Sequence, residues 1–188
     1  MPFRQTTAVQ AANPETVATS CLSDASSGFG SQVWIEGGLF IMGDDSTYSE
    51  EAPAHGVTLS GFWIDSHEVT NGQFARFIAD TGYITVAERQ PPAEAIPSGQ
   101  IPSAMSEPGS VVFRPPSSGQ PLRYWWGWVP GANWRHPEGA GSTIKGRDNF
   151  PVVHVAYEDA AAYAEWAGRS LPTEAQFELV AKNRRDSS

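Results

Sequence analysis

One short stretch in the second half of the sequence carries several side chains that could do chemistry. Arg135, His136 and Glu138 stand within four positions of one another, soon after a cluster of tryptophans. An arginine, a histidine and a glutamate could act as an anion anchor, a base and an acid near neutral pH. Alternatively, these residues, with Asn133 and Trp134, satisfy and pack the backbone of an irregular loop. We favour this structural interpretation, so no catalytic residue is assigned.

The tryptophan cluster precedes that loop. Trp125, Trp126 and Trp128 are spaced as on a strand or an extended loop, where successive side chains alternate between two faces. Large rigid aromatic surfaces of this kind line peptide and ligand clefts, although each ring could equally belong to the core. The pattern therefore predicts either one wall of a groove or a buried layer.

The sequence contains no local metal-binding or nucleophile motif. The histidines, at positions 55, 67, 136 and 154, are never spaced as in HxH or HxxxH. His154 stands in an apolar run, which is typical of a hydrogen-bonded core histidine. Phosphate loops and GxSxG elbows are also absent, and the single cysteine, Cys21, cannot form an internal disulfide. We therefore assign no metal ligand.

Length and charge narrow the class of protein. The 188 residues suffice for one sizeable domain, and the formal net charge of −9 disfavours nucleic acid and anionic membranes as partners. The first thirty residues lack the apolar core of a secretory signal, and later runs are too short to span a membrane. These features predict a cytoplasmic protein with a disordered leader over residues 1–30 and one domain over residues 31–188.

Several elements that must position the loop can be predicted from local patterns. Residues 33–42 contain two apolar runs around Gly37 and Gly38, which favours a hairpin. Residues 71–80 follow a capping box formed by Thr70 and Gln73, which favours a helix. A proline-rich stretch over residues 91–121 predicts a long irregular insertion, interrupted by a short edge strand at 110–113.

Towards the end of the sequence the pattern changes from strand to helix. The run FPVVHVAY, residues 150–157, is β-branched and predicts a strand, whereas residues 157–167 have helical spacing with Gly168 at the stop. A further capping box, Thr173 to Gln176, predicts that another helix begins there. Strands and helices of these kinds predict an α+β domain.

The blocks GGLFIMG, FWIDSHEVTNGQFARFIADTGYITVAER, WWGWVPGANWRHPEGAGSTI and FPVVHVAYEDAAAYAEWAGRSLPTEAQFE closely resemble the formylglycine-generating enzymes, also called sulfatase-modifying factors, of bacterial type. The resemblance runs from about Val33 to Ala181. It implies an irregular, loop-rich α+β fold, distantly similar to C-type lectins. The block GRSLPTEAQFE is shared with a wider superfamily, whereas GANWRHPEG is more particular to the formylglycine-generating branch.

The resemblance also implies an activity. Members of this family are copper-dependent oxidases that use O2 to convert a cysteine, within a Cys-x-Pro-x-Arg segment of an unfolded sulfatase, into Cα-formylglycine. The same resemblance implies that Trp125 stands at a groove-wall position and that Glu68 and Ala87 are near groove-lining positions. An acidic groove suits a substrate that bears arginine.

Departures from the family pattern predict an incomplete domain. The copper-binding cysteine pair and the calcium sites of the family lie in its C-terminal half, and neither is found in this sequence. The chain thus resembles the N-terminal portion, which makes a missing C-terminal half a candidate partner. Ala164 and Ala181 occupy positions that hold disulfide cysteines in secretory-pathway relatives, in agreement with a reducing compartment.

Two functions remain open from the sequence. The first is that the chain is a formylglycine-generating enzyme or the N-terminal fragment of one. The second is that it is a noncatalytic module that keeps the groove and binds a peptide or partner. A downstream reading frame containing the cysteine pair would support the first. Missing packing partners would also leave apolar faces, such as parts of the 157–167 helix, in water, so we expect the isolated chain to be aggregation-prone.

Overall fold

The computed structural model describes residues 30–91, 103–114 and 125–183. The predicted leader and most of the proline-rich insertion lie outside these residues. The described part of the chain combines helices with three separate two-stranded sheets. The elements are β1 (Gln32–Ile35), β2 (Gly38–Met42), η2 (Ser49–Glu51), β3 (His55–Leu59), β4 (Phe62–Asp65), α2 (Asn71–Thr81), η3 (Val86–Glu88), η5 (Ser103–Ser106), β5 (Gly109–Phe113), β6 (Trp126–Pro130), α3 (Tyr157–Trp166) and α4 (Glu174–Asn183).

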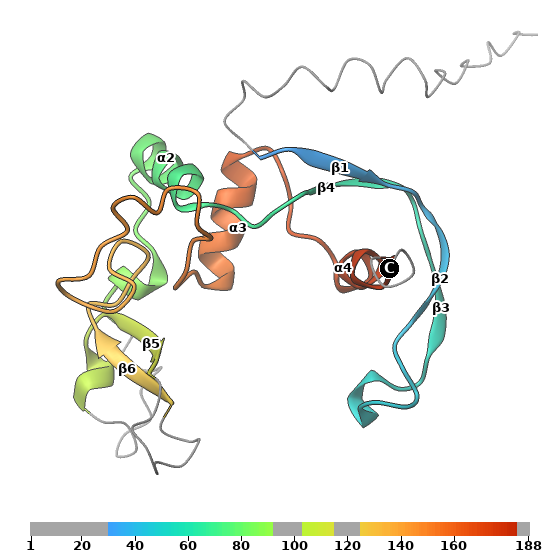
Figure 1. The fold of residues 1–188 in the computed structure, drawn as a ribbon, viewed down its shortest axis with the longest axis horizontal. Helices are drawn as coiled ribbons and strands as arrows, with labels where there is room; N and C mark the ends of the chain where they lie inside the picture. Colours follow the sequence, from blue (N-terminus) through green and yellow to red (C-terminus); the bar gives the residue numbers. More distant parts are fainter. Residues whose placement is uncertain (1–29, 92–102, 115–124, 184–188) are drawn as a thin grey trace, which may run out of the picture.

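These elements form an arch with two arms (Figure 1). Strands β1 to β4 and helix α4 make up what we call the ribbon arm. Helices α2 and α3, strands β5 and β6 and the loops between them make up the helical arm. Helix α4 lies inside the curve of the ribbon, whereas the β5–β6 sheet lies at the far end of the helical arm (Figure 1). No helix among the described residues is both long and apolar enough to cross a membrane.

Strand pairing in the ribbon arm shows that the predicted hairpin at residues 33–42 is wrong. Strand β1 pairs with β4 and β2 pairs with β3, both antiparallel, so the two runs do not pair with each other. At Gly37 a Cβ atom would lie 2.5 Å from the carbonyl oxygen of Leu59. The glycine therefore permits a close approach between two backbones rather than a turn, and the chain continues along one interrupted ribbon.

Helix α2 confirms the prediction for residues 71–80. The Thr70 N–H donates to Gln73 Oε1 at 2.9 Å, and the Gln73 N–H donates to Thr70 Oγ1 at 3.4 Å. Gly82 ends the helix in the left-handed conformation, with φ of 66°, and donates its N–H to Ile78. Both phenylalanines of the helical stripe, Phe74 and Phe77, are buried. Local caps and an apolar stripe thus place this helix in the core.

The main core lies between α2 and α3. Phe74 stacks on Tyr163 with ring centroids 5.9 Å apart, and Phe77 meets Tyr163 edge-on at 5.7 Å. Trp134, from the irregular loop, contributes a third wall and contacts Phe74 at 5.3 Å. Aromatic pairs at such separations stabilise a core beyond the area they bury. The loop that the sequence singled out is consequently anchored in the centre of the helical arm.

The predicted strand at residues 150–157 does not form. Its only ladder contact is an isolated bridge between Thr70 and Pro151, with no partner strand among the described residues. The segment instead satisfies the start of α2, because Phe150 accepts from the Asn71 N–H and Val152 donates to Val69. His154 has a φ of 57°, which further interrupts the extended backbone that a strand requires.

Strand β5 and helices α3 and α4 agree with their predictions. Strand β5 forms where an edge strand was expected and pairs with β6, which contains Trp126 and Trp128. Helix α3 follows residue 156 and stops before Gly168, which has a φ of 67°. Helix α4 begins directly after Thr173, whose reciprocal capping bonds with Gln176 measure 2.8 and 3.2 Å.

Candidate functional site

The loop from Asn133 to Glu138, which we call the 133–138 loop, is closed by its own hydrogen bonds. The Asn133 N–H and the His136 N–H each donate to the other residue's carbonyl oxygen at 3.1 Å. The Asn133 side-chain oxygen also accepts from the N–H groups of Arg135 and His136, at 2.9 and 3.1 Å. An asparagine side chain that replaces backbone partners in this way is typical of a fixed turn.

Trp134 and Arg135 connect this loop to its surroundings. The Trp134 ring is buried in the core, while the Arg135 guanidinium stacks over it at 4.2 Å from the ring centroid. Arg135 Nη1 also donates to Glu88 Oε1 at 2.6 Å, in η3. A guanidinium that stacks on an aromatic ring and pairs with a carboxylate is held from two directions. The loop and η3 are therefore one connected unit.

His136 and Glu138 are exposed and lie on the outer side of the loop. His136 Nδ1 is 2.6 Å from the carbonyl oxygen of Ser142, and the Glu138 N–H donates to Ser142 Oγ at 3.0 Å. The His136 ring therefore has a backbone partner, and among the described residues no hydrogen bond or ion pair joins it to the Glu138 carboxylate. The arrangement does not bring a base and an acid together.

His154 has two partners in the helical arm. Its Nδ1 is 2.8 Å from Ser110 Oγ in β5, and its Nε2 is 2.7 Å from the carbonyl oxygen of Pro137. Both ring nitrogens are thus used, and the ring joins the 133–138 loop to the β5–β6 sheet. This geometry agrees with the interpretation of His154 as a hydrogen-bonded histidine of the interior.

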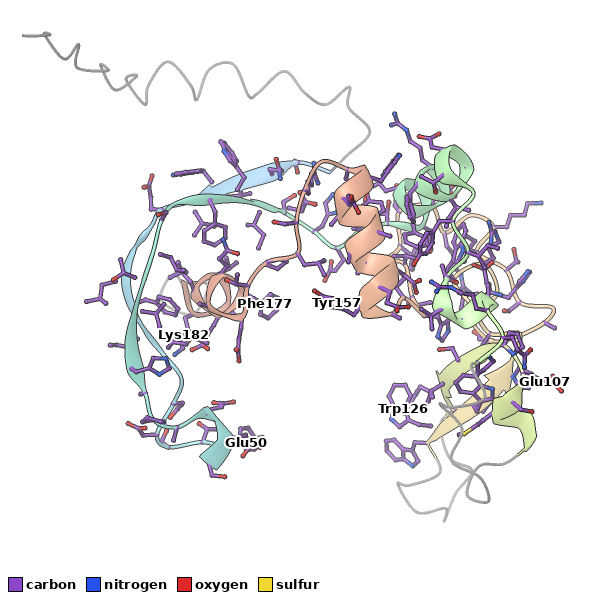
Figure 2. The ribbon with its side chains drawn as sticks, turned by 180° about the vertical axis from the view of Figure 1, so that it is seen from behind. Glu50, Glu107, Trp126, Tyr157, Phe177 and Lys182 are labelled. Atoms are coloured by element: carbon purple, nitrogen blue, oxygen red, sulfur yellow. The ribbon has the colours of Figure 1, made fainter. Side chains whose placement is uncertain are left out.

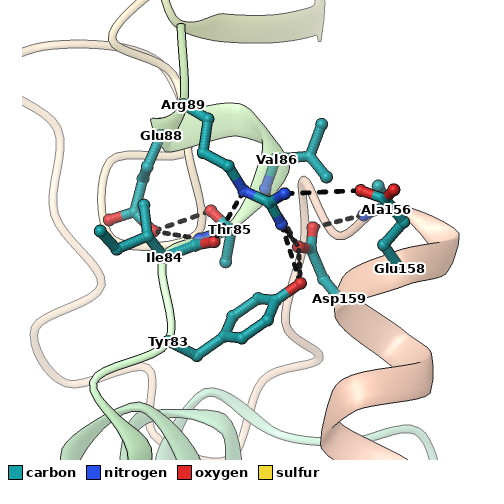
Figure 3. Close-up of polar contacts among 9 residues, drawn as sticks. All are labelled: Tyr83, Ile84, Thr85, Val86, Glu88, Arg89, Ala156, Glu158 and Asp159. Atoms are coloured by element: carbon teal, nitrogen blue, oxygen red, sulfur yellow. Dashed lines mark hydrogen bonds and ion pairs between the residues drawn. The ribbon is translucent and has the colours of Figure 1, made fainter.

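A carboxylate that local sequence patterns do not single out organises the segment around η3. Asp159, in the first turn of α3, is 0% exposed. Its oxygens accept from the Tyr83 hydroxyl at 3.0 Å, the Val86 N–H at 3.0 Å and the Ala156 N–H at 2.8 Å (Figure 3). Arg89 lies 3.5 Å from the same carboxylate. Asp159 thus fastens the chain before and within η3 to the N-terminus of α3.

The polar contacts around η3 extend to Glu88. One oxygen of Glu88 accepts from the N–H and the hydroxyl of Thr85, at 3.1 and 2.7 Å, while the other pairs with Arg135. Burial raises the pKa of the Tyr83 hydroxyl above its ordinary value of 10.0, and its hydrogen bond to Asp159 adds to that increase. We call residues 83–89 with Asp159 the η3 clamp; the Thr85-x-x-Glu88 spacing was the sequence signal that could have revealed part of it.

Two of the three predicted groove residues lie in the helical arm. Ala87 is buried in η3, which packs against β5. Trp125 immediately precedes β6, accepts a hydrogen bond from the Arg114 N–H at 2.6 Å, and meets Phe113 edge-on at 5.7 Å. Its indole Nε1 is buried without a hydrogen-bond partner among the described residues. The η3 clamp and the β5–β6 sheet therefore place Ala87 and Trp125 in neighbouring elements.

Glu68 occupies a different position. It is exposed, and it lines a shallow pocket before α2 together with His67, Thr70, Asn149 and Pro151. Neither Ala87 nor Trp125 lines that pocket. The structure thus places two of the three predicted groove residues in adjoining elements. Glu68 lies apart from them, in the segment between β4 and α2.

The described residues offer no donor set for a metal ion. Across residues 30–91, 103–114 and 125–183, no group of three or more histidine, cysteine, aspartate or glutamate side chains could hold one. Cys21 lies outside these ranges. A copper or calcium ion has no fitted site in this part of the chain.

Comparison with known proteins identifies the family. Residues 19–187 match the Sulfatase-modifying factor enzyme 1-like domain. The formylglycine-generating enzyme of Mycobacterium tuberculosis is 51% identical over 151 residues, which cover 79% of this chain and 50% of the relative. The mouse inactive C-alpha-formylglycine-generating enzyme 2 is 38% identical over 80% of this chain and 46% of the relative.

The chain thus spans about half the length of the curated relatives it matches. Among solved structures, PvdO from Pseudomonas aeruginosa aligns with a TM-score of 0.40 at 22% identity, over 76% of this chain and 41% of PvdO. The family match, in contrast, extends over most of the sequence. The protein belongs to the family of sulfatase-modifying factor enzyme 1-like domains.

Proposed function

We propose that this chain is the substrate-binding part of a formylglycine-generating enzyme. The activity in question converts the cysteine of a Cys-x-Pro-x-Arg segment in an unfolded sulfatase into Cα-formylglycine. The observation that carries this proposal is the 51% identity, over 151 residues, to a relative named formylglycine-generating enzyme. Because that match covers half of the relative, the activity of the whole enzyme is part of the proposal.

The described residues contribute binding and orientation in this proposal. Trp125 and Ala87 line a groove for the extended peptide on the helical arm, and Glu68 contacts a more distant part of the substrate. The η3 clamp supports the groove, since it fixes the backbone on both sides of Ala87. A net charge of −9 favours a peptide that carries arginine over an acidic one.

Copper, in this proposal, is held outside the described residues. The family's copper supplies the oxidising chemistry with O2, but the described side chains provide no ligand group for it. We therefore assign the thiolates that bind copper, and the calcium sites, to the part of the family domain that this chain does not match. Thiolate is the ligand type that copper(I) prefers.

The finer features of the fold and the cellular setting are also proposals. We propose that the two arms are part of a larger, distantly C-type-lectin-like domain that is incomplete here. We further propose a reducing, cytoplasmic location, because Ala164 and Ala181 stand where secretory-pathway relatives carry disulfide cysteines. A periplasmic or extracellular location in a fractionated culture would contradict the latter.

A second candidate is a noncatalytic module that binds a peptide or a partner protein. It is supported by the relative named inactive C-alpha-formylglycine-generating enzyme 2, which is 38% identical over 80% of this chain. Sequence similarity of this extent therefore does not by itself separate the active from the inactive relatives. Peptide binding is common to both candidates, whereas oxidation belongs only to the first.

The test separates binding from chemistry. A fluorescent peptide containing Cys-x-Pro-x-Arg is titrated with the chain, and fluorescence anisotropy gives the dissociation constant. We expect the Trp125→Ala variant to bind at least about tenfold more weakly, equivalent to about 1.4 kcal/mol. A peptide with alanine in place of arginine should also bind more weakly. Equal affinity for the wild type and the variant would refute the groove at Trp125.

Oxidation is then measured by mass spectrometry, which detects conversion of the thiol to the aldehyde. The chain alone with copper and O2 is expected to leave the peptide unchanged. The chain together with the unmatched half of the Mycobacterium tuberculosis relative is expected to oxidise it. Binding without oxidation in both samples would favour the noncatalytic module.

A further inference from the structure

Three large aromatic side chains from three different elements point into the space between the two arms. Trp126 of β6 is 63% exposed, Tyr157 of α3 is 78% exposed and Phe177 of α4 is 65% exposed. Figure 2 shows all three directed towards the open side of the arch rather than away from it. We call these three residues the inner aromatic face.

An arrangement of this kind differs from ordinary scattered exposure. Single apolar residues on a surface are normal, but aromatic side chains each bury about 150–250 Å² when covered. Three that share one side of the molecule leave a large apolar area in water, which is the usual mark of a protein interface. The inner aromatic face is thus a surface that gains free energy when it is covered.

The contacts between the arms do not cover this face. Helix α4 packs against β2 and β3, whereas α2 packs against α3. Between the arms, Arg169, which follows α3, pairs with Asp65 of β4. Neither of the two buried clusters among the described residues joins α4 to α3. The arms are connected at the top of the arch, and its inner side lacks a core of its own in the described residues.

We propose that the inner aromatic face is the docking surface for the part of the family domain that lies outside this chain's match. That part is about half of each relative's length, and so is similar in size to the part that this chain matches. A second copy of this chain fits less well, because it would bring a further formal charge of −9 against the first. This inference rests on the proposed function for the identity of the partner. What it adds is the surface of this chain that the partner covers.

The test supplies this partner as a separate polypeptide. The chain is co-expressed with the half of the Mycobacterium tuberculosis relative that lies outside the match, with an affinity tag on one chain. We expect the two polypeptides to co-purify and to elute in size-exclusion chromatography with light scattering as a one-to-one complex. Failure of the wild-type chain to form this complex would overturn the proposal.

Substitutions then locate the surface. The double variant Tyr157→Asp and Phe177→Asp places two charges on the inner aromatic face and should weaken the complex at least about a hundredfold. Leu39→Asp is the matched control, because Leu39 is 72% exposed on β2. Side chains alternate along a strand, so Leu39 lies on the face of the ribbon opposite the half-buried Phe40. We expect the control to bind like the wild type.

All three substituted positions are already exposed, so the variants should keep the α2–α3 core. Far-UV circular dichroism and the thermal transition of each chain check this expectation. An equal loss of binding in the control and the double variant would overturn the proposed location. A homodimer of the wild-type chain that the double variant abolishes would show instead that a second copy covers this face.

The results also separate this interface from the proposed function. If the complex forms through the inner aromatic face but does not oxidise the peptide, the interface stands and the catalytic function fails. If the chain binds the peptide through Trp125 but does not bind the separate half, the interface fails and the groove stands.

Discussion

The two arms of the arch are stabilised in different ways. In the helical arm, a cluster of buried aromatic rings lies between α2 and α3, and the η3 clamp ties the surrounding loops to it. In the ribbon arm, side chains of strands β1 and β2 are mostly exposed, and Glu178 and Lys182 of α4 form polar contacts with the backbone at the end of β2. The comparison shows that, among the described residues, both buried apolar clusters lie in the helical arm, whereas the ribbon arm has none of its own.

The largest expected effect tests whether the helical arm contains the main core. Phe74 is buried against Phe77, Trp134 and Tyr163. We expect Phe74→Ala to lower the free energy of unfolding by about 3–5 kcal/mol, because it removes buried area and leaves a cavity. Phe177→Ala, in the ribbon arm, should change it by less than about 1 kcal/mol. Urea denaturation followed by tryptophan fluorescence measures both values, and similar losses would contradict the difference between the arms.

The next effect concerns the η3 clamp. Replacement of Asp159 by asparagine keeps the shape but points an amide donor towards groups that are themselves donors. We expect a loss of about 2 kcal/mol, since hydrogen bonds to a charged group contribute about 1.5–3 kcal/mol. Tyr83→Phe removes one of these bonds and should cost about 1 kcal/mol. In the double variant, the loss of unfolding free energy should be smaller than the sum of the two single losses. Strict additivity would show that the two residues do not act together.

The two arms should also lose stability at opposite ends of the pH scale. In the ribbon arm, the hydrogen bonds from Lys182 and the Gly43 N–H hold the pKa of Glu178 below its ordinary value of 4.5. A lowered folded-state pKa gives stability that is present above 4.5 and is lost as the pH falls through the lower folded value. We expect the Gly43 amide to lose protection against hydrogen exchange, relative to its intrinsic rate, as the pH falls, and Glu178→Gln to reduce that pH dependence.

Tyr83 of the helical arm behaves in the opposite sense. Because its pKa is raised above 10.0, the neutral hydroxyl is favoured in the folded state. Its contribution is therefore complete below pH 10.0 and is lost as the pH rises through the folded value. Alkaline titration with hydrogen exchange at Val86 should show the clamp loosening, and Tyr83→Phe should lack this transition. An identical alkaline transition in the variant would assign it to another group.

The smallest expected effect is a gain of stability. Ala156 precedes α3 with extended dihedral angles, φ of −80° and ψ of 168°, and its side chain forms no cap. We expect Ala156→Ser to add about 0.5–1 kcal/mol, because a serine hydroxyl can accept from the free N–H groups of the first turn. Thermal denaturation measures the change. A decrease would show that the neighbouring Asp159 network leaves no room for the hydroxyl.

The sequence by itself determined the features that depend on interactions between residues close together in the chain. The caps at Thr70 and Thr173 and the glycine after each of α2 and α3 are recognisable because a helix terminus is satisfied by residues three or four positions away. The strand at 110–113 and the buried stripe of α2 follow for the same reason, since periodicity is a local property. The family was likewise recognisable from blocks of contiguous residues.

Tertiary structure decided which distant segments meet. Gly37 could have made a turn or a close approach, and only the presence of the 55–65 segment beside it selected the approach. Residues 150–156 have strand-like composition, but their backbone groups pair with the start of α2 instead. Asp159 becomes an organising residue because the chain at 83–89 folds onto it from more than seventy positions away. Such pairings depend on the free energy of the whole packed arrangement, which no local pattern encodes.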